Sequence, residues 1–107
     1  MLRDRVAAFG QQIDEAFAGH SRVREIRQRG FAAALDLAPD RKSTEVFPLA
    51  QRVGLQVCLR ARARGLLIRP LGDSLLLVPA PGLTESELGE VVRRTRGAID
   101  DFFATSF

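Results

Sequence analysis

The chain has 107 residues, 46% of them hydrophobic, which predicts a single folded domain spanning residues 1–107. Its one cysteine excludes an internal disulfide and a cysteine zinc cage, and no long apolar run predicts a leader or a membrane span, so we expect a cytoplasmic protein. The net charge of +3 comes from sixteen basic residues scattered among thirteen acids, which argues against a nucleic-acid partner.

An amphipathic helix is predicted at the start of the chain. Apolar residues recur there every three or four positions, as they do on the buried face of a helix. Gly19 is placed to end this helix near His20. The apolar stripe consists of Leu2, Val6, Phe9, Ile13 and Phe17.

Two strands are predicted next, over residues 23–29 and 31–38, and Gly30 between them suggests a bend or a bulge. In the second strand the side chains alternate, so that alternate residues from Phe31 onward share one face, as in a strand covered on one side. A polar loop follows at residues 40–45.

A second helix is predicted to begin near Pro48, which suits the first turn, and to end at Gly65, which suits the position after the last turn. Gly54 lies inside this helix, where glycine costs about 1 kcal/mol relative to alanine, so we expect close packing there. The last turns carry Arg60, Arg62 and Arg64, which complement the helix dipole.

The stretch from Gly65 to Pro81 contains two short apolar runs bounded by glycine and proline, which predicts two buried strands joined by a turn at residues 70–72. Arg69 closes the first apolar run. An arginine there serves either as the internal partner of Asp36 or Asp73, or as a rigid fork for a carboxylate or a phosphate. The residues alone leave both roles open.

A final helix is predicted from a capping box, in which Thr84 and Glu87 bond to each other's backbone, with Leu83 and Leu88 as a hydrophobic staple. The element order is helix, two strands, helix, two strands, helix. This order predicts an α+β two-layer domain, with a mostly antiparallel sheet of about four strands covered by three helices. The apolar face of the last helix comprises Leu88, Val91, Val92, Thr95, Ile99, Phe102 and Phe103.

The other residues with chemical potential favour structural roles. His20 lies at a helix end, where a capping or solvated role is expected. Cys58 lies within a helix without a histidine to activate it, so we expect a small core residue. Lys42 lies in a polar loop, where water should hold it charged and prevent it from forming a Schiff base. Asp100 and Asp101 are expected on a solvated face.

Residues 65–72, which read Gly-Leu-Leu-Ile-Arg-Pro-Leu-Gly, resemble the C-terminal end of class III aminotransferases, which depend on pyridoxal phosphate. The strand that ends in Pro79 and the capping box of the last helix add to the resemblance. The Arg-Pro-Leu-Gly form is closest to the biotin-pathway members, the adenosylmethionine-8-amino-7-oxononanoate aminotransferases. Residues 23–30 and the opening helix are also similar to the small domain of that family.

The resemblance implies the small domain of a fold-type I homodimer, packed over an active site in a large cofactor-binding domain. It implies that Arg69 binds the substrate carboxylate. The cofactor segment and its lysine are not matched, and Lys42 does not have that lysine's context. We therefore expect a fragment or truncated form of a pyridoxal-phosphate-dependent aminotransferase that binds no cofactor and does not transaminate by itself. The alternative is a non-catalytic assembly module, in which the apolar faces of the first and last helices pair with another chain.

Overall fold

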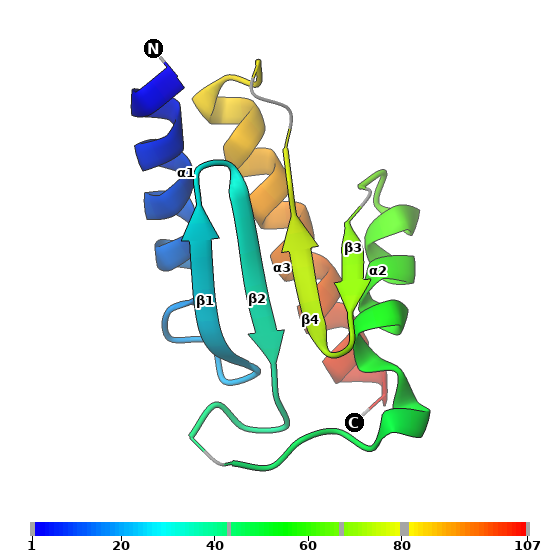
Figure 1. Cartoon of the computed structure of the whole chain (residues 1–107). Coiled ribbons are helices and arrows are strands. Elements are labelled where there is room, and N and C mark those ends of the chain that lie inside the picture. Colours follow the sequence, from blue (N-terminus) through cyan, green and yellow to red (C-terminus); the bar gives the residue numbers. More distant parts are fainter. Residues whose placement is uncertain (1, 43, 67, 80–81, 107) are drawn as a thin grey trace.

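Figure 1 shows the chain as a computed structural model, which describes residues 2–42, 44–66, 68–79 and 82–106. Each half of the chain contributes one β-hairpin, and helices come before, between and after the hairpins. The elements are α1 (Leu2–Phe17), β1 (Val23–Arg29), β2 (Ala32–Leu37), the 3₁₀ helix η1 (Leu49–Gln51), α2 (Val53–Ala63), β3 (Arg69–Leu71), β4 (Ser74–Leu77) and α3 (Glu85–Ser106).

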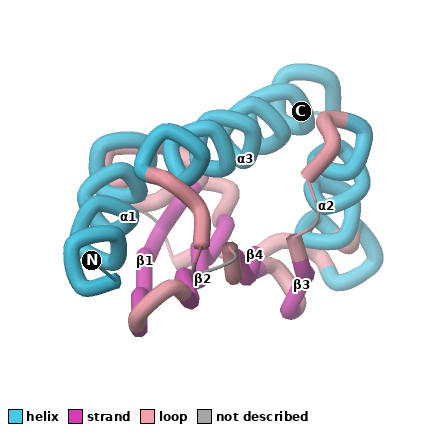
Figure 2. The backbone as a smooth tube through the Cα atoms, turned by 90° about the horizontal axis from the view of Figure 1, so that it is seen from above, coloured by secondary structure: helices cyan, strands magenta, loops and turns pink. Residues whose placement is uncertain are grey.

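The four strands form one antiparallel sheet in the order β1-β2-β4-β3, so the two hairpins meet along β2 and β4. Seen from above, the helices lie on one side of this sheet, with α2 at the end nearest β3 (Figure 2). The predicted α+β architecture and its order of helices and strands are therefore confirmed. The opposite side of the sheet carries no helix of the described chain.

The core lies between the sheet and the helices. Alternate residues of β2 and β4 point into it, as the period of two in a strand requires. The apolar stripe predicted for α1 is buried at Phe9, Ile13 and Phe17, and that helix ends where Gly19 placed it. The sheet and α3 contribute Ala33, Leu35, Leu37, Leu75, Leu77, Leu88, Val92, Ile99, Phe102 and Phe103.

Both hairpins turn through two-residue loops that start with a glycine of positive φ. Gly30 has a φ of 59° and Gly72 a φ of 61°, which is the conformation required at the first position of such a tight turn. The prediction of a bend or bulge at Gly30 is therefore wrong, because Gly30 belongs to the turn itself. The irregularity in this hairpin lies instead in β1, between Val23 and Glu25.

The strand β3 differs from its prediction in place and in exposure. It spans three exposed residues and starts at Arg69, whereas a buried strand ending at Arg69 was predicted. Pro70 lies inside the strand, opposite Leu75, instead of in the turn. The physical reason is that β3 is an edge strand, where a proline without an N–H is tolerated. The turn then falls on Gly72 and Asp73.

The predicted second helix is interrupted. After η1, Arg52 adopts a left-handed conformation with φ 45° and ψ 52°, which ends one helical segment, and α2 begins at Val53. Its C-terminus is as predicted, because the N–H groups of Gly65 and Leu66 donate back to the carbonyls of the last turn, each over 3.0 Å. This pattern, with Gly65 at a φ of 79°, is a Schellman motif.

Gly54 packs closely against the β3–β4 turn, which confirms the close packing predicted from a glycine inside this helix. A Cβ atom at this position would lie 2.2 Å from the carbonyl oxygen of Gly72. The helix α2 therefore approaches the hairpin that carries Arg69 as closely as backbone allows.

The capping box of α3 is confirmed. The N–H of Thr84 donates to Oε1 of Glu87 over 2.9 Å, and the N–H of Glu87 donates to Oγ1 of Thr84 over 3.1 Å. The bond that the Glu87 carboxyl accepts from the backbone N–H of Thr84 is the largest cause that lowers the pKa of this carboxyl, and the Thr84 hydroxyl lowers it further. Leu83 and Leu88 both pack against the core.

Candidate functional site

The candidate site is the face of the sheet that the helices leave uncovered. In β4, Leu75 and Leu77 point towards the helices, so Leu76 points the other way. Arg69 is the register partner of Leu76, and its exposed side chain therefore belongs to the same outer side. We call this side the open face. The residues of this face that matter below are Arg27, Ala34, Asp36, Arg69, Ser74 and Leu76.

One row of the open face crosses all four strands. Arg27 in β1 is opposite Ala34 in β2, Ala34 is opposite Leu76 in β4, and Leu76 is opposite Arg69 in β3. The two arginines therefore stand at opposite ends of the row, separated by an alanine and a leucine. Their electrostatic surroundings differ.

The arginine at the β1 end is neutralised. Arg27 donates through Nη1 to Oδ2 of Asp36 over 2.8 Å and through Nη2 to Oδ1 over 2.9 Å, which is a bidentate ion pair. The hydroxyl of Ser74 donates to the same carboxylate over 2.5 Å. Asp36, one of the two acids predicted as an internal partner for Arg69, is therefore occupied by other residues.

No acid among the described residues holds Arg69 in this way. Asp73, the second predicted internal partner, lies in the turn after β3, and burial raises the pKa of its carboxyl. Within residues 2–42, 44–66, 68–79 and 82–106, no ion pair or side-chain hydrogen bond includes Arg69. Of the two roles that the sequence left open, the internal pair is not formed by the described acids. The ligand-binding role stays a prediction.

His20 has a structural role in the described chain. Its side chain is only 7% exposed, so the predicted solvated role is wrong, and its ring bonds to the loop after α1 and to α3 instead of to the last carbonyls of α1. Nδ1 accepts the backbone N–H of Arg22 over 3.1 Å, and Nε2 lies 2.6 Å from Oδ1 of Asp100. Since Nδ1 accepts, Nε2 carries the proton of the neutral ring and donates to Asp100. The ring thus joins the end of α1 to α3.

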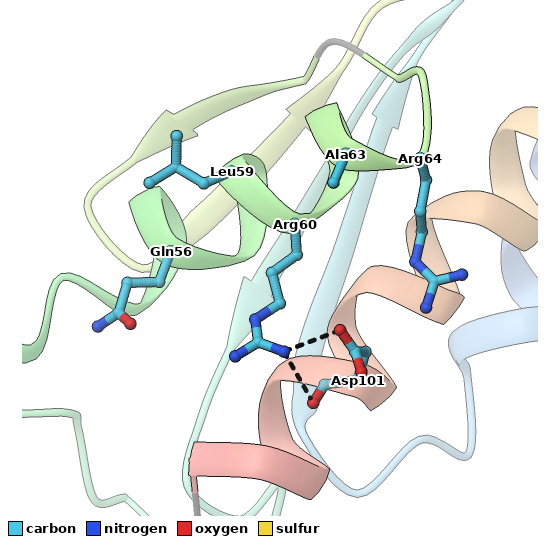
Figure 3. A pocket seen from close by; sticks show the side chains of 6 residues that line it. All are labelled: Gln56, Leu59, Arg60, Ala63, Arg64 and Asp101. Atoms are coloured by element: carbon cyan, nitrogen blue, oxygen red, sulfur yellow. Dashed lines mark hydrogen bonds and ion pairs between the residues drawn. The ribbon is translucent and has the colours of Figure 1, made fainter.

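The two adjacent aspartates lie on a solvent-exposed face, as predicted, with side chains that are 51% and 43% exposed, and each also holds a side chain from another element. Asp100 contacts His20, and Asp101 accepts a 2.8 Å hydrogen bond from Nη1 of Arg60. Figure 3 shows the latter pair in a shallow pocket between α2 and α3. This pocket belongs to the helical layer and does not include Arg69; it is lined by Gln56, Leu59, Arg60, Ala63, Arg64 and Asp101.

The remaining reactive side chains do not form a cofactor site. Burial raises the pKa of the Cys58 thiol to about 11, which confirms a core residue without nucleophilic character at neutral pH. Lys42 is exposed in a loop, as predicted. A Schiff-base lysine needs a desolvated setting, so the described residues do not fit pyridoxal phosphate. Nor does the described part of the chain hold a cluster suited to a metal ion or a helix able to cross a membrane.

Arg27, Ser74 and Leu76 were not predicted as members of this site. Alternation alone indicates that Arg27 and Asp36 face outward from neighbouring strands. It does not give the register that brings their charges together or places Leu76 opposite Arg69. That register depends on the two tight turns and on the irregularity in β1.

No protein-family model matches the chain. Curated relatives do match it. The adenosylmethionine-8-amino-7-oxononanoate aminotransferase of Nitratidesulfovibrio vulgaris is 40% identical over 77 residues, which are 72% of this chain and 14% of the relative. The enzyme of the same name from Aquifex aeolicus is 30% identical over 100 residues, which are 94% of this chain and 22% of the relative.

The fold is also that of solved aminotransferases. A PMP-bound aminotransferase from Vibrio fluvialis superimposes with a TM-score of 0.91 at 28% identity, over 99% of this chain and 23% of that chain. The present chain therefore spans only about a fifth of the length of the relatives that it matches. The comparisons agree with the resemblance to class III aminotransferases seen in the sequence.

Proposed function

We propose that this chain, a homologue of one part of the class III aminotransferases, is the small domain of such an enzyme and that Arg69 binds the substrate carboxylate. The enzyme would be a pyridoxal-phosphate-dependent transaminase of biotin biosynthesis, acting on 8-amino-7-oxononanoate. Its large domain and a second subunit would be the partners of this chain. The names of the relatives support the substrate, and the open face supports the role of Arg69.

The single observation that carries the proposal is the contrast between the two ends of one row of the sheet. Arg27 is held by Asp36, whereas Arg69 is exposed and has no partner among the described residues. A guanidinium group presents a planar fork of N–H donors that matches a carboxylate. Pro70 fixes the backbone next to Arg69, so the base of this fork is pre-organised.

In this role Arg69 positions the substrate and does no covalent chemistry. A carboxylate held at one end of an extended substrate places the reacting oxo group at a set distance from the sheet. Pyridoxal phosphate, when bound to an aminotransferase, carries the amino group between two substrates. Because the described residues of this chain do not fit that cofactor, the cofactor and its lysine would come from the large domain.

The test is a chimaera in which residues 1–107 replace the matching segment of the Aquifex aeolicus enzyme. The substrate pair is 8-amino-7-oxononanoate and its primary amide, which lacks the negative charge. Charged hydrogen bonds contribute enough that we expect the chimaera to prefer the acid by about 10- to 100-fold in kcat/KM. Arg69→Ala should remove this preference, and Arg69→Lys, which keeps the charge without the fork, should retain part of it.

The matched control is Arg29→Ala, because Arg29 is an exposed arginine on the opposite edge strand. This variant should keep the preference for the acid. An acid-to-amide ratio unchanged by Arg69→Ala would remove the assigned role. Equilibrium binding of octanoate and octanamide to the same proteins gives a second readout that does not need turnover. The 107-residue chain assayed alone should show no transamination.

The alternative of a non-catalytic assembly module loses its predicted surface. The apolar stripes of the first and last helices were expected to pair with another chain. They are buried against the sheet instead, at residues such as Phe9, Phe17 and Ile99.

A further inference from the structure

The immediate neighbours of Arg69 on the open face are apolar. Leu76 lies directly across the ladder from it, where opposite Cβ atoms are about 4.5–5.5 Å apart. Leu71 lies two residues further along β3, on the same face, and is 62% exposed. The guanidinium therefore emerges between two leucine side chains.

The polar groups closest to this setting are already used. Ser74 donates its hydroxyl to Asp36, and Asp36 also accepts both bonds from Arg27. Beyond Leu76 in the same row stands Ala34, which has no polar group. A ligand whose carboxylate meets Arg69 thus finds, among the described side chains of this row, only carbon next to the charge.

We propose that Leu76 is a specificity-determining residue, forming the apolar wall against which the substrate carbons next to the carboxylate lie. This inference rests on the proposed function of Arg69 and adds the residue that would exclude acids with a polar substituent next to the carboxylate. A hydroxyl on the carbon beside the carboxylate would lose its water and gain no hydrogen-bond partner from Leu76 or Ala34.

The expected discrimination is moderate. An apolar surface distinguishes substrates that differ by one small group by about 10- to 100-fold in kcat/KM. Leu76 is half-buried rather than enclosed, so we expect a value near the lower end. The effect should be seen for substituents next to the carboxylate and should fade for substituents near the reacting end.

The experiment compares 8-amino-7-oxononanoate with its 2-hydroxy derivative in the same chimaera. The unmodified protein should prefer the unsubstituted acid by about tenfold. Leu76→Ser should bring the ratio of the two kcat/KM values towards one, and Leu76→Met, which is apolar and similar in volume, should keep it. Val46→Ser is the control, because Val46 is an exposed apolar residue in the loop before η1.

The outcomes separate this inference from the role of Arg69. If Leu76→Ser leaves the hydroxyl preference unchanged while Arg69→Ala abolishes the acid preference, Leu76 is not the wall. If the acid preference does not depend on Arg69, the proposed function fails and this inference fails with it. For a variant that folds but does not turn over, the kcat/KM ratio is replaced by the ratio of equilibrium binding constants for octanoate and 2-hydroxyoctanoate. Equal loss of both ligands in Leu76→Ser would also overturn the proposal.

Discussion

The two faces of the sheet follow different rules, although they are made by the same strands. In β2, Ala33, Leu35 and Leu37 point towards the helices and are buried, whereas Ala34 and Asp36 point outward. The inner face is stabilised by removing apolar area from water, which depends little on exact pairing. The outer face depends on which charged groups come opposite one another.

This difference decides where a ligand can bind. Side chains of the inner face are buried against the helices, and the charged side chains of Glu25, Arg27 and Asp36 on the outer face form ion pairs with one another. Arg69 is left at the edge of the sheet with neither kind of partner among the described residues. A charge of this face that can meet a ligand must therefore be one without an internal partner, and among the described residues Arg29 at the opposite edge shares this property with Arg69. The difference between the two faces can be tested by perturbing each face separately.

The largest effect is expected from a pair of neighbouring leucines. Leu75→Ala removes a fully buried side chain and should lower the free energy of unfolding by about 2–5 kcal/mol. Leu76→Ala acts on the open face and should cost about 1 kcal/mol or less. Urea denaturation of both variants measures the difference. Equal losses would mean that the open face is covered and packed like the inner one.

The next effect concerns the support of the β3–β4 hairpin. Gly54→Ala places a methyl group 2.2 Å from the backbone oxygen of Gly72 and should destabilise the fold by about 2 kcal/mol, despite the better helix propensity of alanine. Gly97→Ala is the matched control in α3. There the nearest atom is the end of the flexible Arg64 side chain, at 3.1 Å, so up to about 1 kcal/mol of stabilisation is expected. Thermal unfolding that ranks the two variants in the reverse order would contradict the close approach.

The smallest effect should come from the exposed hydrogen bonds of the α3 capping box. Their acceptor, the Glu87 carboxyl, titrates, whereas the apolar side chains of the inner face do not. The bonds from Thr84 lower the pKa of Glu87 below its ordinary value of 4.5 in the folded state only. Their contribution is therefore complete above pH 4.5 and is lost as the pH falls through the lowered pKa. Glu87→Gln keeps the capping bond without the titration and should flatten the loss of stability in acid. Denaturation midpoints between pH 3 and 6 check this, and an unchanged slope would speak against it.

The elements that were predicted correctly are those fixed by local chemistry. The helical spacing of Phe9 and Ile13, the capping box at Thr84 and the closing glycine at Gly65 each depend on residues a few positions apart. Gly54 was also predicted to mark close packing, although the identity of its neighbour was not. At these positions the structure that the local sequence favours is also the one that the packed fold contains.

The predictions that failed depend on contacts between distant segments. Whether Gly30 is a bulge or a turn is decided by the register of β1 with β2, and Pro70 enters a strand because the sheet ends there. The left-handed conformation of Arg52, which interrupts the predicted second helix, was also missed, because residues other than glycine rarely adopt it. The pairing of Arg27 with Asp36, nine residues away across a hairpin, likewise needs the register.

The proline in β3 has a consequence for how this surface behaves in solution. An edge strand normally offers a row of free N–H and C=O groups on which another polypeptide can assemble, and such additions start aggregation. β3 is only three residues long, and its central residue supplies no N–H at all. Pro70 therefore makes the margin beside Arg69 a poor template for β-augmentation, while leaving it accessible to a small molecule.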